Sequence, residues 1–228
     1  MLKLQCVTLL TPMLEQQKIF YTQVIGLPIL NDCTDAFTVK IGHSHLKFER
    51  STIAGASPFY HFAFDILGNK LDEATVWLNA RGIALNGLPQ HTDQFYSATW
   101  NSTSIYFYDP AGNIVEFIAR HNFNHSSMDP FTTDSLLNIS EIGLVVHHVP
   151  AASELLRSYF SIDGYKDSND SFAAVGDEDG LFILSADQRV WLGSNKKAGV
   201  YKTEVVIEGA GNKGELLIEG YPYKITAC

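Results

Sequence analysis

The chain contains 228 residues, carries a formal net charge of −9 at pH 7, and is 46% apolar. This length and composition can bury a substantial core in one large or two small domains, which excludes a disordered chain. The acidic balance, without a basic cluster larger than Lys196–Lys197, gives no electrostatic basis for binding nucleic acid or an anionic membrane. The three cysteines form no disulfide framework, and neither a signal peptide nor a transmembrane span is apparent, so we expect a cytoplasmic location.

The first 120 residues predict the same order of elements twice: a strand, a helix and then further strands. In chain order we expect a strand at 2–10, a helix at 13–25 ended by Gly26, two or three strands within 28–50, a strand at 58–66, a helix that follows Asn69 and stops at Gly82, a loop with a short strand at 86–99, and a hairpin at 105–117.

The last strand of the first group alternates apolar and charged residues. Leu46 and Phe48 alternate with His45, Lys47 and Glu49, so one face is apolar and the other is charged. If the apolar face packs on helices, the charged face lines a concave surface. His45 and Glu49 are then candidate substrate contacts, and the alternative is that they are solvated strand residues.

The hairpin at 105–117 delivers one charged residue into an apolar strand. Asp109 and Gly112 provide its turn, since proline follows the aspartate and glycine tolerates a positive φ. Glu116 then lies in the middle of the second strand. A buried carboxylate needs a cation, a metal or hydrogen-bond donors, so Glu116 is the first candidate for a functional residue, and a water-facing glutamate is the alternative.

The second half repeats this organisation incompletely. Polar residues at 122–138 predict a linker. A third unit follows, with a strand from Glu141 and a helix at 150–160. A strand at 203–208 begins a fourth unit, but only 20 residues follow it, which is too few for a helix and a full sheet.

Four segments together resemble the vicinal oxygen chelate superfamily, which includes glyoxalases, bleomycin-resistance proteins, fosfomycin-resistance transferases and extradiol dioxygenases. These segments are 5–9, 19–27, 60–65 and 105–117. The resemblance implies an α+β fold, with tandem βαβββ modules that form open mixed-sheet cups. It places a two-module glyoxalase-like domain at 1–121 and a degenerate one at 139–228, which would cover the first domain or form a homodimer interface.

The resemblance also implies a divalent metal, Zn, Mn, Fe or Ni, held by Cys6, His61 and Glu116. Histidine and glutamate suit such a metal. Cys6 departs from the family, where histidine, glutamate or glutamine is usual. It is either a thiolate ligand or a small buried hydrophobe.

The second half offers a poorer ligand set. Glu141, Glu204 and Glu219 fall near the positions that would hold ligands there, but no histidine accompanies them. Three anions alone are a poor site for a borderline metal. We therefore expect the second half to be a structural partner.

The resemblance predicts a metal-dependent lyase, isomerase, transferase or dioxygenase that acts on a small oxygen-rich molecule. The metal would take two neighbouring substrate oxygens and act as a Lewis acid. Glu116 would take part in catalysis, and Tyr106 or Tyr108 could donate a hydrogen bond to a bound oxygen. The extradiol signature fits residues 105–116, but its histidine is missing from residues 97–99. The alternative function is metal-free binding of a small molecule, as in bleomycin-resistance proteins.

Overall fold

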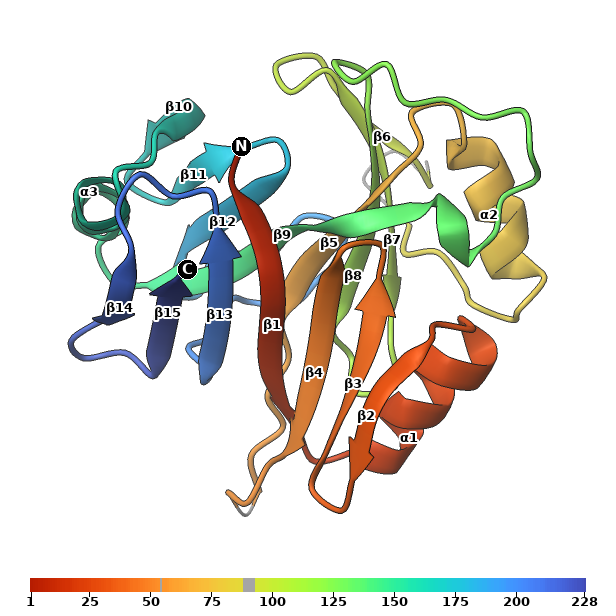
Figure 1. Cartoon of the computed structure of the whole chain (residues 1–228), viewed down its shortest axis with the longest axis horizontal. Coiled ribbons are helices and arrows are strands. Elements are labelled where there is room, and N and C mark those ends of the chain that lie inside the picture. Colours follow the sequence, from red (N-terminus) through yellow and green to blue (C-terminus); the bar gives the residue numbers. More distant parts are fainter. Residues whose placement is uncertain (54, 88–92) are drawn as a thin grey trace.

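The structure is a computed structural model that describes residues 1–53, 55–87 and 93–228. The described residues form two mixed β-sheets, of seven and eight strands, with the helices at their edges and outer faces (Figure 1). The chain builds these sheets from four successive units, of which the fourth has no helix in the described residues.

The first unit contains β1 (Lys3–Thr11), α1 (Leu14–Ile19), a π-helical segment (Phe20–Val24), β2 (Ile29–Cys33), β3 (Ala36–Ile41) and β4 (Ser44–Arg50). The second contains β5 (His61–Ile66), α2 (Leu71–Asn79), β6 (Phe95–Ser97), β7 (Ser102–Tyr108) and β8 (Ile114–Arg120). The third begins with a 3-10 turn (Thr133–Ser135) and contains β9 (Leu136–Val146), α3 (Val149–Phe160), β10 (Gly164–Asn169), β11 (Phe172–Asp177) and β12 (Gly180–Ala186). The fourth contains β13 (Thr203–Glu208), β14 (Gly214–Leu217) and β15 (Tyr223–Ala227).

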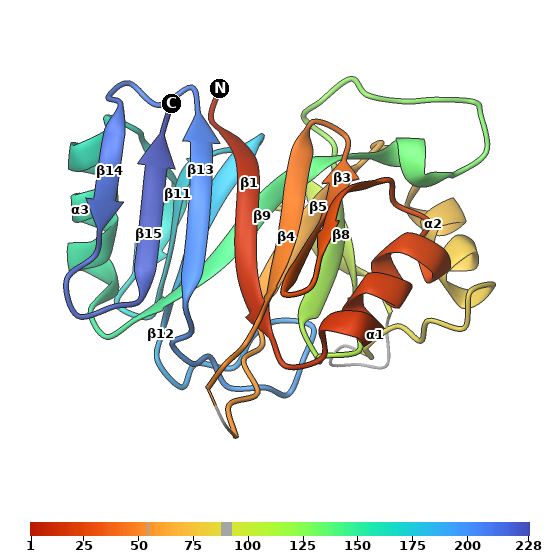
Figure 2. The same cartoon turned by 60° about the horizontal axis from the view of Figure 1, so that its bottom comes forward.

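The units pair differently from the sequence prediction. The first unit joins the fourth through β1 and β13, in the sheet that Figure 2 shows running from β14 to β3. The second unit joins the third through the antiparallel pair β5 and β9. The predicted division into a self-contained domain at 1–121 and another at 139–228 is therefore corrected, because each sheet combines strands from both halves.

One large apolar core holds the two sheets together. It contains Leu46 and Phe48 from the seven-stranded sheet and Phe62, Phe117 and Ile142 from the eight-stranded sheet, all fully buried. Successive side chains of a strand point to opposite faces. The residues between these core positions therefore face away from the core, and this second face of the eight-stranded sheet carries its buried polar groups.

Most predicted elements are confirmed, with shifts at their ends. The helix predicted at 13–25 is α1 followed by the π-helical segment, and Gly26 ends it with φ +89°. Gly112 adopts φ +77° in the hairpin turn, as predicted. Asn69 does not cap α2; its side-chain amide donates at 2.8 Å to the carbonyl of Ser127, which lies in the segment between β8 and the 3-10 turn.

The predicted linker at 122–138 is three residues too long, because β9 begins at Leu136. Part of the predicted loop at 86–99 lies outside the described residues. Within the described part of the chain, no helix is long and apolar enough to cross a membrane.

Candidate metal centre

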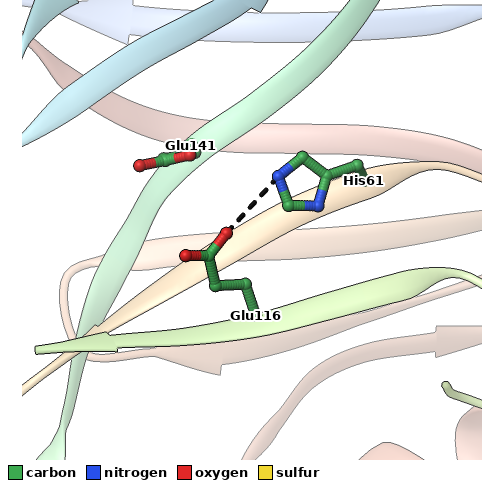
Figure 3. A group of neighbouring side chains, drawn as sticks. All are labelled: His61, Glu116 and Glu141. Carbon is green, nitrogen blue, oxygen red and sulfur yellow. Dashed lines mark ion pairs between the residues drawn. The ribbon is translucent and has the colours of Figure 1, made fainter. Parts of the chain in front are cut away.

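Three buried side chains from neighbouring strands converge on the second face of the eight-stranded sheet. His61 comes from β5, Glu116 from β8 and Glu141 from β9. One potential ligand atom of each lies within 4.8 Å of those of the other two (Figure 3).

The strand register explains this convergence. Ala63 of β5 pairs with Glu116 on one side and with Glu141 on the other. His61 lies two residues before Ala63, so all three side chains share a face. Ala63 lies between the two glutamates in the ladder and contributes only a methyl group to this face.

The imidazole of His61 is oriented for ligation. Its Nδ1 lies 3.2 Å from the Ile114 carbonyl, and a carbonyl can only accept, so Nδ1 carries the proton. Burial lowers the pKa of His61, which favours the neutral ring. Its Nε2 lone pair then faces Glu116 Oε2 at 3.5 Å. Two acceptors facing each other need a cation or a proton between them.

A buried arginine compensates only part of the negative charge. Arg120 donates from Nη2 to Glu141 Oε1 at 2.6 Å and from Nε to Asp65 Oδ1 at 3.1 Å. Asp65, Glu116 and Glu141 are three carboxylates against the one guanidinium that forms ion pairs with them, and His61 is neutral. The cluster therefore carries a charge of −2 when its carboxylates are ionised, which is the charge that one divalent cation neutralises.

The same imbalance affects the protonation of the cluster. Burial raises the pKa of Asp65 to about 7 and, together with the nearby Glu116, that of Glu141 to about 7. Burial also raises the pKa of Glu116. Without a cation, protons therefore compete for these carboxylates near neutral pH.

The cluster forms the floor of a cavity of about 230 Å³. Its walls combine aromatic side chains with serine hydroxyls: Phe95, Ser97, Trp100, Ser102, Ser104, Tyr106, Phe172 and Trp191. Trp191 covers His61, with ring centroids 5.0 Å apart. The hydroxyl of Tyr106 donates to Glu116 Oε1 at 3.1 Å, so the sequence prediction that Tyr106 lies near the site agrees with its position.

Cys6 does not join this cluster. It lies half-buried on β1, in the seven-stranded sheet, beside Thr8, Lys47 and Glu204. Its sequence-based assignment as a metal ligand beside His61 is therefore corrected: the structure brings Glu141 there in its place. The cause is the strand pairing, which gives β5 the neighbour β9 instead of an element of the first unit.

The other predicted substrate contacts also lie elsewhere. His45 and Glu49 are on β4, in the seven-stranded sheet, and Glu49 forms ion pairs with Lys47 at 2.6 Å and Lys202 at 3.6 Å. Tyr108 does not line the cavity; Lys196 Nζ lies 4.8 Å from the centre of its ring. The assignment of these three residues to the site with Glu116 is corrected accordingly.

The pairing of β5 and β9 gives the site an approximate twofold symmetry. Phe62 pairs with Ile142 across the two strands, and His61 precedes Phe62 as Glu141 precedes Ile142, so His61 and Glu141 are equivalent, and so are Ala63 and Gly143. On that basis Glu116 corresponds to the residue that pairs with Gly143 on β12, which is Ile183. The fourth position is therefore apolar, and three protein ligands remain.

The seven-stranded sheet presents the same four positions with different chemistry. The registers of β1 with β4 and β13, and of β13 with β15, place Cys6, Lys47, Glu204 and Thr226 there. The lysine occupies the position that Glu116 has in the other sheet. Lys47 puts a permanent cation where the first site has a carboxylate, and this cation pairs with Glu49, so substitutions in the second sheet can serve as controls for the first.

Sequence reasoning missed three features of the site. Glu141 was considered only with Glu204 and Glu219, although it is a lone charge in the apolar strand Ile139–Val146, which is the signal that identified Glu116. Arg120 shows the same pattern at the end of β8. The segment that carries Trp191 over the site has no such local signal.

Comparison with solved structures identifies the fold. A candidate dioxygenase from Bacillus subtilis superposes with a TM-score of 0.66 at 11% identity, over 99% of this chain and 84% of that one. Glyoxalase I from Zea mays superposes with a TM-score of 0.57 at 12% identity, over 100% of this chain and 92% of that one. The chain has the vicinal oxygen chelate fold. The resemblance predicted from four short segments is therefore confirmed at the level of the fold. No protein-family model matches the sequence, and no curated protein is significantly similar to it.

Proposed function

We propose that this protein is a metal-dependent enzyme of the glyoxalase and dioxygenase type, which acts on a small oxygen-rich substrate. His61, Glu116 and Glu141 would hold the divalent metal, and two neighbouring substrate oxygens would occupy its open positions. The observation that carries the proposal is the convergence of the three ligand atoms within 4.8 Å, in a buried cluster with an uncompensated charge of −2.

The ligand chemistry narrows the choice of metal. One imidazole and two carboxylates suit Mn²⁺, Fe²⁺, Ni²⁺ or Zn²⁺, and the set lacks the thiolate that favours softer ions. Two-histidine, one-carboxylate sites are typical of non-haem iron oxygenases. This site has the opposite ratio of ligands, which favours a Lewis-acid role over oxygen activation.

Such a metal would supply Lewis acidity towards the substrate oxygens. The protein would supply the rest. Tyr106 holds the Glu116 carboxylate in place through its hydroxyl, and the ring of Trp191 shields His61 from water. Without a metal, burial and the neighbouring Glu116 raise the pKa of Glu141 to about 7, so metal binding would displace a proton from this carboxylate at neutral pH.

Metal-free binding of a small molecule remains the rival function, since the cavity alone would serve it. The excess negative charge of the cluster disfavours metal-free binding, because two buried carboxylates without a cation destabilise a pocket that only binds a small molecule. In the seven-stranded sheet, by contrast, the position equivalent to Glu116 holds Lys47, which forms an ion pair with Glu49.

Metal analysis tests the proposal. Wild-type protein reconstituted with Mn²⁺ or Zn²⁺ and then desalted should retain about one ion per chain. Glu141→Gln should lower retention at least tenfold, because one of three ligands is lost and the amide is a weaker donor. Glu204→Gln is the matched control, since Glu204 occupies the equivalent position in the other sheet, and it should retain metal like the wild type. Equal retention in both variants, or none in the wild type, would refute the proposal.

A further inference from the structure

The segment between β12 and β13 forms the roof of the cavity. It folds back on itself through a bridge between Val190 and Lys197. Asn86 of the second unit donates from Nδ2 to the Gly193 carbonyl at 2.8 Å, and Lys196 Nζ donates to the Gly112 carbonyl. The roof is thus held against the unit that supplies His61 and Glu116, and its side chains are part of the site.

This roof presents one cation to the cavity. Arg189 lines the cavity and is half-buried. Within the described residues its guanidinium has no ion pair and no hydrogen bond; it lies over the ring of Phe172, 5.0 Å from the ring centre. Burial lowers the pKa of Arg189, in the direction expected for a cation that has lost water without gaining an anion.

Arg189 differs in this respect from Arg120, the other guanidinium on this face of the sheet. Arg120 forms ion pairs with Asp65 and Glu141 and does not line the cavity, and its remaining nitrogen, Nη1, is buried without a hydrogen-bond partner in the described residues. An arginine that lines a cavity with its donors unused is suited to bind a carboxylate of a ligand, because a guanidinium can donate two parallel hydrogen bonds to it.

Aromatic and aliphatic side chains line much of the space between the roof and the floor. Trp100, Phe172 and Trp191 supply aromatic faces, and Phe95 and Leu192 lie at the rim, 36% and 40% exposed. The volume of about 230 Å³ is below the range of roughly 300–1,000 Å³ that holds drug-sized ligands. The ligand must therefore be small, and aromatic walls favour a planar unsaturated body.

We infer that the substrate is a small planar carboxylate, whose carboxylate group is bound by Arg189 and whose unsaturated body lies between the aromatic walls. Its two neighbouring oxygens would reach the cluster of His61, Glu116 and Glu141; this last part rests on the proposed function. Arg189 is then a specificity-determining residue, which distinguishes acids from neutral analogues of the same shape.

Binding of two pairs of probes tests the inference in the purified full-length protein. Benzoate and benzyl alcohol differ in the carboxylate and need no metal. The second pair, 3,4-dihydroxybenzoate and catechol, adds neighbouring oxygens. Quenching of tryptophan fluorescence can follow binding, because Trp100 and Trp191 line the cavity. Each acid should bind at least tenfold more tightly than its neutral partner, the effect of a charge-assisted hydrogen bond.

Variants of Arg189 test whether this residue causes the preference for the acids. Arg189→Gln should remove the preference for both acids and leave binding of the neutral probes within about twofold. Arg189→Lys should restore part of it, and Arg157→Gln, on the exposed side of α3, is the control that should change nothing. Thermal unfolding checks that each variant is folded.

The outcomes separate the inference from the proposed function. If benzoate binding depends on Arg189 but 3,4-dihydroxybenzoate gains nothing from added metal, the carboxylate site stands and the metal site fails. Equal affinity for acid and alcohol, an Arg189→Gln variant that still prefers the acids, or no saturable binding of either acid in the millimolar range would overturn the inference.

Discussion

The metal-free protein should lose stability as the pH rises from about 4 to about 7, which is the reverse of ordinary acid denaturation. The cause is the buried cluster around Arg120. The pKa of Asp65 rises from 3.8 to about 7 on folding, so the folded protein binds this proton more tightly than the unfolded chain does. The resulting stability is fully present below about pH 4 and is lost as the pH passes through 7.

The size of the expected stability loss follows from the pKa shift of Asp65. Three pKa units at 1.36 kcal/mol each give about 4 kcal/mol for Asp65, which is almost completely buried and therefore poorly screened by solvent. The pKa of Glu141 shifts in the same direction, from 4.5 to about 7. Both carboxylates share Arg120, so their contributions are not additive, and the figure of about 4 kcal/mol refers to Asp65 alone.

Urea unfolding in the presence of a chelator, at a series of pH values, measures this effect. The difference between wild type and Asp65→Asn isolates the cluster, because the variant lacks the titrating group and should show a flatter profile. Glu204→Gln should keep the wild-type profile. Added Mn²⁺ or Zn²⁺ should restore stability at about pH 7.5. A metal-free wild type whose stability rises with pH in parallel with Asp65→Asn would refute the reasoning.

Three further substitutions probe the site. Cys6→Ser should leave metal affinity unchanged in calorimetric titration, since Cys6 lies in the other sheet; a hundredfold loss would contradict this. Arg120→Met should lower the free energy of unfolding of the metal-free protein at neutral pH by about 3–5 kcal/mol, because it leaves buried carboxylates without their cation. A denaturant midpoint equal to that of the wild type would be inconsistent with the ion pairs. Gly193→Ala should weaken probe binding and lower the melting temperature, because a Cβ there would lie 2.1 Å from the Tyr106 ring at a residue with φ +70°. Gly87→Ala is the control, since its Cβ would meet nothing within 4 Å. Equal effects of the two substitutions would exclude this packing role of Gly193.

Local sequence signals were sufficient to predict the strands that carry His61 and Glu116. A turn with proline and glycine fixes the hairpin, and period-two alternation fixes the face on which Glu116 lies. Both features depend on residues close in sequence. The structure places Glu116 on that face, directly opposite Tyr106 in the ladder.

Which strands of different units pair with each other could not be predicted from such local signals. Whether β5 pairs with β1 or with β9 depends on contacts between residues far apart in the chain, and each of these strands has one apolar face. The error over Cys6 and Glu141 follows from this single question. Once β9 lies beside β5, the lone glutamate of its apolar strand completes the cluster, and Cys6 remains among the polar residues of the seven-stranded sheet.

The most direct test of the central claim is an anomalous difference map from crystals of the protein loaded with Mn²⁺ or Zn²⁺. The account predicts one strong peak on the second face of the eight-stranded sheet, about 2.0–2.2 Å from the ring nitrogen of His61 and from carboxylate oxygens of Glu116 and Glu141. A site without a peak in metal-saturated crystals, or a peak beside Cys6 and Glu204 in the other sheet, would contradict it.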